Sequence, residues 1–292
     1  MVMKKISIRY IYYYTIILIL LTILSACSST RFFYSFLDEF IQNEVEYFFN
    51  LNEEESALLN QQVSNMISWH RKHMLLKYSD YLNNVSDILE LDQYKNAEIE
   101  NTLATGRSLI EQTVIGFTPY ASKFLVQHQT TDAINFMEKQ MEKRQQKRQT
   151  ELSEPKDKLY QERLNRLKTN FKRFLESLNS EQVILLEVYA LKTLDDAKIR
   201  LDNRTMRQKA FITFMKTQPN EVKLTTYLNQ LILNGHEITN PSYKSFSETW
   251  QNRFRQLLVD MLAISSNSQR KAIILKLRSY ANDFKEISES ER

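Results

Sequence analysis

Apolar residues recur at helical spacing along most of the chain that follows residue 30. The longest periodic run begins at Asn52, which forms a capping-box pattern with Glu55. The positions that then repeat every three or four residues are Leu59, Val63, Met66, His70, Met74, Tyr78, Leu82, Val85 and Leu89. Neither glycine nor proline interrupts this run, so it predicts one amphipathic helix of about forty residues.

Shorter helices are predicted over most of the remaining chain, and polar caps or prolines mark their ends. A first helix is predicted over 31–49. Gly106 and the segment 116–119 punctuate the chain after the long helix, with Thr118 and Pro119 suited to the cap and first turn of a helix. The further predicted helices are 119–127, 131–152, 156–178, 179–201, 203–217, 220–233, 242–264 and 267–288, with a loop at 234–241.

Two later helix starts repeat the capping box of the long helix, Asn179 with Gln182 and Ser266 with Gln269. The chain contains only three glycines and four prolines, whereas sheet-rich folds and phosphate-binding loops need glycine at their turns. The sequence therefore predicts an all-α fold, an extended multi-helix bundle with long antiparallel helices. We expect one helical domain over 31–292, with either one sizeable core or two small ones.

The N-terminus has the order of a secretory signal peptide, with basic residues, an apolar run and then small residues. The basic residues are Lys4, Lys5 and Arg9, and the apolar run covers 11–24. Leu24, Ser25, Ala26 and Cys27 resemble the lipobox of bacterial lipoproteins, in which the cysteine receives a diacylglyceryl group and becomes the new N-terminus. We therefore expect a cleaved lipoprotein signal peptide at 1–26 and a lipidated Cys27. The alternatives are a transmembrane anchor, for which the run is short, and a buried structural thiol.

A lipid anchor on Cys27 would attach the chain to a membrane without spanning it, because more than one acyl chain gives stable binding. Aspartate after the cysteine commonly retains lipoproteins at the inner membrane, so Ser28 favours the outer membrane and the periplasmic side. Residues 27–30 then form a short tether. The first helix carries an apolar stripe of Phe32, Phe33, Phe36, Leu37, Phe40 and Ile41. We expect this stripe to pack in a core, with contact at the membrane interface as the alternative.

The charge of the chain depends mainly on its N-terminal segment. The 39 basic and 35 acidic residues give a net charge of +4, and three of the basic residues belong to 1–26. Without those three the chain is close to neutral at +1, which argues against a nucleic-acid partner. Charged residues are densest at 138–148 and 156–173, where we expect solvated helix faces with ion pairs, and binding of anionic lipid or lipopolysaccharide is the alternative. The single cysteine excludes internal disulfides.

The sequence offers little basis for catalytic chemistry. His70 and His73 lie one helical turn apart and are weak candidates for a metal site, but no third ligand is identifiable from spacing. His70 falls on the apolar face of the long helix, where a partly buried, hydrogen-bonded histidine is expected. The chain has no HExxH, GxSxG, P-loop or dinucleotide-binding motif, so we expect neither a catalytic residue nor a cofactor.

Several short segments carry a resemblance to a known family. They are the lipobox, Arg31-Phe32-Phe33-Tyr34, Trp69-His70-Arg71, Leu178-Asn179-Ser180-Glu181-Gln182, and the closing Gln269-Arg270, Leu275 and Leu277-Arg278-Ser279-Tyr280. Together they resemble a proteobacterial lipoprotein family of unknown function, domain-of-unknown-function family 6279. The resemblance covers nearly the whole chain after residue 26 and implies a signal, a lipid anchor and a helical domain, with no known active site. Asn52 and Glu55 stand where the family usually has threonine and glutamine.

The function that we expect is that of a lipid-anchored protein of the bacterial cell envelope. It would face the periplasm and act without catalysis, by binding a protein or lipid partner or in a structural role. A periplasmic holdase is the alternative, because the capped helix starts are also similar to the LTxxQ motif of small periplasmic chaperones. A metal-dependent enzyme that uses His70 and His73 is the least favoured hypothesis.

Overall fold

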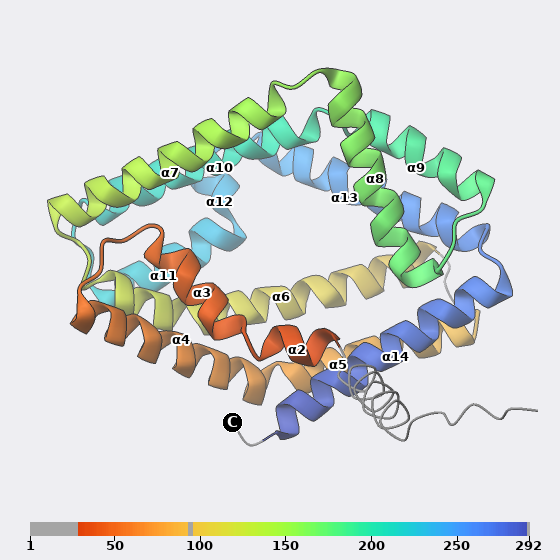
Figure 1. Ribbon diagram of the computed structural model, residues 1–292, viewed down its shortest axis with the longest axis horizontal. Helices are drawn as coiled ribbons and strands as arrows, with labels where there is room; N and C mark the ends of the chain where they lie inside the picture. The colour runs from red at the N-terminus through yellow and green to blue at the C-terminus, as the bar shows by residue number, and fades with distance from the viewer. Residues whose placement is uncertain (1–28, 93–95, 291–292) are drawn as a thin grey trace, which may run out of the picture.

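Helices form almost all of the structure, a computed structural model that describes residues 29–92 and 96–290 (Figure 1). In chain order they are α2 (Ser29–Tyr34), α3 (Leu37–Glu46), α4 (Glu53–His73), α5 (Leu75–Glu90), α6 (Asn96–Leu125), α7 (Thr131–Leu152), α8 (Lys156–Leu175), α9 (Ser180–Lys192), α10 (Asp196–Met215), α11 (Glu221–Leu233), α12 (Gly235–Thr239), α13 (Tyr243–Ala263) and α14 (Asn267–Glu289). The described ranges contain no strand, so the predicted all-α fold is confirmed. Within them, no helix combines the length and the apolar character that crossing a membrane requires.

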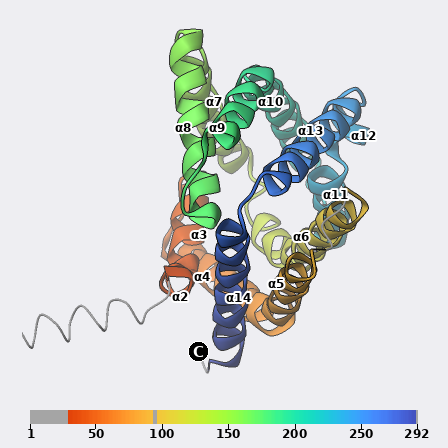
Figure 2. The ribbon, with the colours of Figure 1, turned by 90° about the vertical axis from the view of Figure 1, so that its right-hand side faces the viewer.

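The helices follow the outline of a flattened molecule (Figure 1, Figure 2). Helices α4 and α5 run along one edge, and α6 folds back against α4 and also contacts α11. Helices α7 and α10 pair along the opposite edge, while α8 and α13 both pack against α9. Finally, α14 packs along α5, so the C-terminal helix closes the arrangement against the N-terminal half of the chain.

Two separate apolar clusters stabilise this arrangement. The larger cluster joins α4, α6, α7, α10 and α11, and its buried members include Leu59, Phe124, Met137, Met215 and Leu224. The smaller cluster joins α8, α9 and α13 through Leu164, Leu175, Leu186, Leu257 and Met261. The sequence left open whether the domain has one core or two, and the described residues form these two clusters.

Two of the predicted helices are interrupted. The first one divides into α2 and α3, because the Ser35 hydroxyl donates to the Phe32 carbonyl (2.7 Å) and Phe36 leaves helical geometry at φ −111°. The predicted forty-residue helix divides into α4 and α5 at Met74, which has φ −116°. Met74 is only 1% exposed, so the change of direction places its side chain inside the protein.

The boundary predicted at residue 202 lies several residues earlier, because a tertiary contact ends α9. Arg253 of α13 donates to the carbonyl of Lys192, the last residue of α9, at 3.0 Å. The same guanidinium donates to both carboxylate oxygens of Asp196, at 3.0 and 3.1 Å, and Asp196 begins α10. One arginine therefore satisfies a carbonyl at the end of α9 and joins it to the first side chain of α10. The predicted loop at 234–241 also contains a short helix, α12.

Helix α6 continues through every residue that predicted a break. Gly106 and Gly116 lie inside it and allow aromatic side chains of the neighbouring helices to approach the backbone closely. A Cβ at Gly116 would lie 1.8 Å from the Trp69 ring, and one at Gly106 would lie 2.7 Å from the Tyr81 hydroxyl. The two glycines therefore serve packing, and the predicted punctuation at these positions is wrong.

Pro119 also lies within α6 and does not begin a new helix. A proline nitrogen has no hydrogen, so the carbonyl four residues before it, that of Ile115, loses its usual donor. The Thr118 hydroxyl replaces that donor, with its oxygen 3.0 Å from the Ile115 carbonyl oxygen, and it also lies 2.8 Å from Asn229 Oδ1 on α11. The predicted cap and first-turn roles of Thr118 and Pro119 are therefore wrong.

The three predicted capping boxes are all present. In each, the N-cap side chain accepts a hydrogen bond from the third helical residue, whose own side chain accepts one from the N-cap backbone. The pairs are Asn52 with Glu55, Asn179 with Gln182, and Ser266 with Gln269. These predictions are confirmed because the interaction depends on residues only three positions apart.

Candidate functional site

The residues expected to carry the lipid anchor lie outside the described part of the chain. Leu24, Ser25, Ala26 and Cys27 belong to residues 1–28, so signal cleavage and lipidation stay predictions. The described chain begins at Ser29, the first residue of α2. The first helix therefore follows directly after the expected anchor.

His70 lies between two tyrosines from neighbouring helices. Its Nδ1 is 3.1 Å from the Tyr34 hydroxyl on α2, and its Nε2 is 3.4 Å from the Tyr78 hydroxyl on α5. The Tyr78 hydroxyl also forms a short hydrogen bond with Thr113 on α6. The predicted partly buried, hydrogen-bonded His70 is confirmed, and it connects four helices.

The electrostatics of this cluster favour neutral side chains. Burial lowers the pKa of His70 to about 4 and raises the pKa of Tyr34 to about 12, although Arg71 opposes the tyrosine shift. Burial also raises the pKa of Tyr78. At neutral pH the imidazole and both phenols are therefore uncharged, as expected for a polar cluster that joins packed helices.

The two metal candidates have different surroundings. His73 packs against Trp69, with ring centroids 5.5 Å apart, whereas both nitrogens of His70 face tyrosine hydroxyls. Among the residues that the structure describes, no three His, Cys, Asp or Glu side chains are placed to hold a metal ion. The described residues therefore offer no third ligand near His70 and His73 that would support the metal hypothesis.

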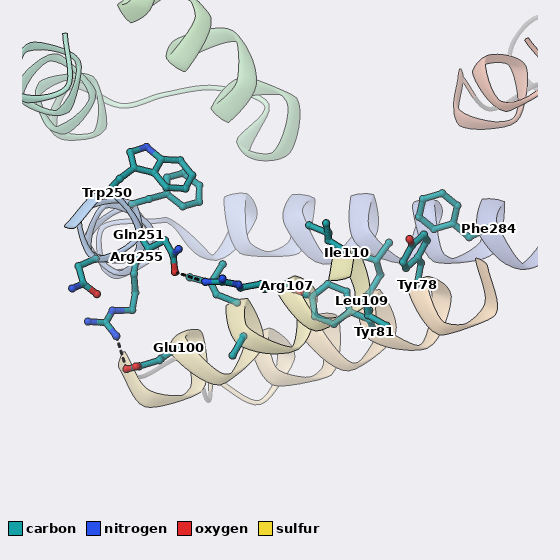
Figure 3. Close-up of a pocket in the computed structure, with 16 residues that line it drawn as sticks. Tyr78, Tyr81, Glu100, Arg107, Leu109, Ile110, Trp250, Gln251, Arg255 and Phe284 are labelled. Carbon is teal, nitrogen blue, oxygen red and sulfur yellow. Dashed lines mark hydrogen bonds and ion pairs between the residues drawn. The ribbon is translucent and has the colours of Figure 1, made fainter. Parts of the chain in front are cut away.

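A cleft of about 760 Å³ lies between α5, α6, α13 and α14, hereafter the apolar cleft (Figure 3). Its apolar and aromatic lining residues include Tyr78, Tyr81, Leu103, Leu109, Ile110, Trp250, Phe254 and Phe284. Ile110 is 64% exposed, so an apolar surface is open to solvent within the cleft. A volume and lining of this kind are typical of sites for small apolar or amphipathic ligands.

Charged groups are concentrated near one end of the apolar cleft. Arg255 forms an ion pair with Glu100, and Arg107 donates to Glu111 at 2.9 Å and to Gln251 at 3.4 Å (Figure 3). Trp250 lies at this end too, and the Tyr78 and Phe284 rings lie 5.7 Å apart at the other end, away from these charges (Figure 3). The cleft therefore combines an apolar body with a polar end.

Sequence reasoning did not identify this cleft. Tyr78 and Leu82 lie on the predicted apolar face of the long helix, but periodicity gives only the face and not the partner. Tyr81 also comes from α5, and the other lining residues come from α6, α13 and α14, which meet only in the folded chain. No pattern within a single helix distinguishes Ile110 or Trp250 from core residues.

The aromatic stripe that was expected in a core divides between two environments. Leu37 and Ile41 pack against the larger cluster, whereas the four phenylalanines face solvent. Their exposed fractions are 57% for Phe32, 72% for Phe33, 48% for Phe36 and 63% for Phe40. The core prediction is therefore wrong for these four residues, hereafter the aromatic surface.

The two densely charged segments have exposed side chains that form ion pairs, as expected. Examples are Arg148 with Glu151 at 2.6 Å, Lys158 with Glu154 at 2.9 Å, and Lys216 with Glu138 at 3.0 Å. Such pairs contribute little to stability, because both charges remain solvated.

Comparison with known sequence families gives a match. The sequence model of a family described as "Family of unknown function (DUF6279)" matches residues 47–244. No curated protein and no solved structure matches the chain. The matched region includes α4 to α12, and therefore the α5 and α6 walls of the apolar cleft.

Proposed function

The chain belongs to this family of unknown function, and we propose that it is a lipid-anchored protein of the cell envelope that binds an amphipathic ligand in the apolar cleft. The observation that carries the binding role is the combination of an apolar lining and a polar end in a cleft of about 760 Å³. The signal-like N-terminus and Cys27 support attachment to the outer membrane, with the helical domain facing the periplasm.

The chemistry of the cleft favours an elongated ligand with one polar end. The end away from the charged groups would contact an apolar chain, and Arg107 and Arg255 would lie near a polar or anionic head. Both arginines already have glutamate partners, so a head group would exchange with existing pairs instead of meeting unpaired charge. We therefore propose binding of fatty-acid-like molecules without a covalent step.

The holdase alternative receives less support from the capping residues that suggested it. Gln182 and Gln269 are 0% and 7% exposed, and each donates to the side chain of the other. Because they are buried, these residues do not form a surface to which a client protein could bind.

A titration with the fluorescent fatty acid cis-parinaric acid tests the binding role. Ile110→Glu places a charge within the apolar cleft and should weaken binding about tenfold, which corresponds to about 1.4 kcal/mol. Ile184→Glu on α9 is the matched control, because Ile184 is 57% exposed and does not line the cleft. Equal affinities of the two variants would contradict the proposal.

Fractionation of cells that express the full chain tests the anchor. We expect the wild-type protein in the membrane fraction. Protein of mature size that carries Cys27→Ala should no longer be stably attached to the membrane. A Cys27→Ala protein that stays fully membrane-bound at the mature size would show that lipid anchoring is the wrong account. Sucrose-gradient separation of the two membranes tests the outer-membrane assignment.

A further inference from the structure

A second concavity, of about 520 Å³, lies between α2, α8 and α14, where the described chain begins. Phe33, Arg173, Lys276 and Tyr280 are among its lining residues. Arg31 attaches α2 to α14 through ion pairs with Asp283, at 3.6 Å, and with Glu286. The position of α2 beside this concavity is therefore fixed by charge pairing.

The concavity is positively charged. Its described lining contains Arg173 and Lys276 but no carboxylate, and neither cation forms an ion pair within residues 29–92 and 96–290. The Lys276 Nζ lies 5.1 Å from the centre of the Tyr280 ring, a cation–π contact that does not neutralise its charge. Two cations that form no ion pair with a described residue, in a concavity lined by aromatic rings, are suited to a phosphate group.

The aromatic surface continues directly from this concavity. Phe33 belongs to both, and the Phe32 ring lies 6.1 Å from that of Phe33 and 5.0 Å from that of Phe36. Phe40 follows Phe36 by one helical turn on α3. Helices α2, α3 and α8 lie on the same broad side of the molecule, which is the left side in Figure 2.

We propose that the aromatic surface, together with Arg173 and Lys276, holds the domain against a bilayer that contains anionic phospholipid. The two cations bind headgroup phosphates, and the phenylalanine rings enter the interfacial region of the bilayer. Cys27 supports a bilayer over other partners, because only Ser28 and Ser29 separate it from Thr30 on the edge of the concavity. The inference rests on the anchor in the proposed function but not on the apolar cleft.

Docking of this kind would orient the domain. A lipid anchor alone leaves a protein free to turn about its tether, whereas a second contact fixes one face against the membrane. The acidic residues Asp38, Glu39 and Glu46 are exposed on α3, the helix that also carries Phe40. Carboxylates are repelled by an anionic surface, so we expect the phosphate contacts to be made by Arg173 and Lys276 beside α2.

The test uses the mature chain purified from membranes and reconstituted in vesicles. A Phe33→Cys variant is labelled with the fluorophore nitrobenzoxadiazole, and quenching by nitroxide-labelled phospholipid is measured. A label at Val222→Cys is the matched control, because Val222 is 75% exposed on α11 and lines neither the apolar cleft nor this concavity. We expect stronger quenching at position 33 than at position 222, and equal quenching at both would overturn the proposal.

The role of charge is tested by comparing vesicles with and without phosphatidylglycerol. In its presence, Arg173→Gln and Lys276→Gln should each lower the docking equilibrium about fivefold, the effect of about 1 kcal/mol per cation at an anionic surface. In pure phosphatidylcholine, the same variants should leave the docking equilibrium nearly unchanged. Equal effects in both lipids would overturn the phosphate contact, provided that circular dichroism shows both variants to be folded.

Failure of the anchor is distinguishable from failure of docking. Cys27 is the single cysteine of the chain, so a wild-type protein that takes up the fluorophore has a free thiol there. That result would contradict the anchor, and quenching at position 33 in a Cys27→Ser background would still decide whether the aromatic surface meets lipid.

Discussion

Gln182 of α9 and Gln269 of α14 hydrogen-bond to each other through both side-chain amides. The Gln182 Nε2 donates to Gln269 Oε1 at 3.1 Å, and the Gln269 Nε2 donates to Gln182 Oε1 at 2.9 Å. Each Oε1 also accepts the backbone N–H of its own N-cap residue, Asn179 or Ser266, at 3.0 Å. Two capping boxes that are far apart in the sequence are thus joined in a buried network, which aligns the starts of α9 and α14.

Removing one of these glutamines should destabilise the protein more than an ordinary cap loss. We expect Gln182→Ala to lower the free energy of unfolding by about 2–3 kcal/mol, because it breaks a cap and removes both buried hydrogen bonds between Gln182 and Gln269. Gln230→Ala on the exposed face of α11 is the control, expected within about 0.5 kcal/mol of wild type. Urea denaturation measures both.

A double-mutant cycle with Gln269→Ala separates the network from the two caps. The loss in free energy of unfolding of the double variant should be smaller than the sum of the two single losses by about 1 kcal/mol or more. The reason is that the shared hydrogen bonds are lost only once. Strict additivity would show that each capping box acts alone.

Gly116→Ala should destabilise the protein although alanine is the better helix former. Alanine gains about 1 kcal/mol in helix propensity over glycine, but its Cβ would lie 1.8 Å from the Trp69 ring. The ring must therefore move, and such overpacking costs about 1–3 kcal/mol. In a Trp69→Leu background the same change should be neutral or stabilising. Urea denaturation of the wild type, the two single variants and the double variant measures this. A Gly116→Ala change that destabilises both backgrounds equally would contradict the prediction.

The stability of the protein should decrease at low pH in part because of His70. Burial lowers its folded-state pKa to about 4 from the ordinary 6.5, so only the unfolded chain takes up a proton between these values. Unfolding therefore becomes more favourable as pH falls through this window, and His70 has no effect above it. After allowance for partial solvent exposure, we expect a loss of about 1–2 kcal/mol between pH 7 and 4.5.

The contribution of His70 can be isolated with a variant that does not titrate. In His70→Gln the loss of stability between pH 7 and 4.5 should be smaller than in wild type by about that amount. Guanidinium denaturation at the two pH values gives the comparison. If both proteins lose the same free energy, the buried imidazole is not the source of the pH dependence.

Breaking the Arg253–Asp196 pair should have a larger effect than breaking a surface pair. Asp196 is 5% exposed, so Arg253→Met leaves a buried carboxylate without its partner and should cost about 3 kcal/mol. Arg148→Met removes an exposed pair with Glu151 and should cost less than about 0.5 kcal/mol. Thermal unfolding measures both variants. Similar losses of stability would show that the buried Arg253 pair contributes no more than the exposed pair.

The predictions from sequence succeeded where the physics is local. The capping boxes at Asn52, Asn179 and Ser266 depend on neighbours three positions away, and all three formed. The break predicted at Pro119 failed because the Thr118 hydroxyl lies within hydrogen-bonding distance of the Ile115 carbonyl that proline leaves without a donor. Gly116 failed as a helix break because the decisive contact comes from Trp69 on another helix.

The amino-acid sequence by itself determined the helical class, the caps and the expected anchor at Cys27, since these depend on composition and on residues close together in the chain. Only the tertiary structure decided which apolar residues became core and which became surface. Leu37 and Phe36 are adjacent members of one periodic stripe, yet Leu37 packs inward and Phe36 remains exposed. Periodicity defines a helix face, whereas the number and position of the helices that cover that face depend on the whole fold.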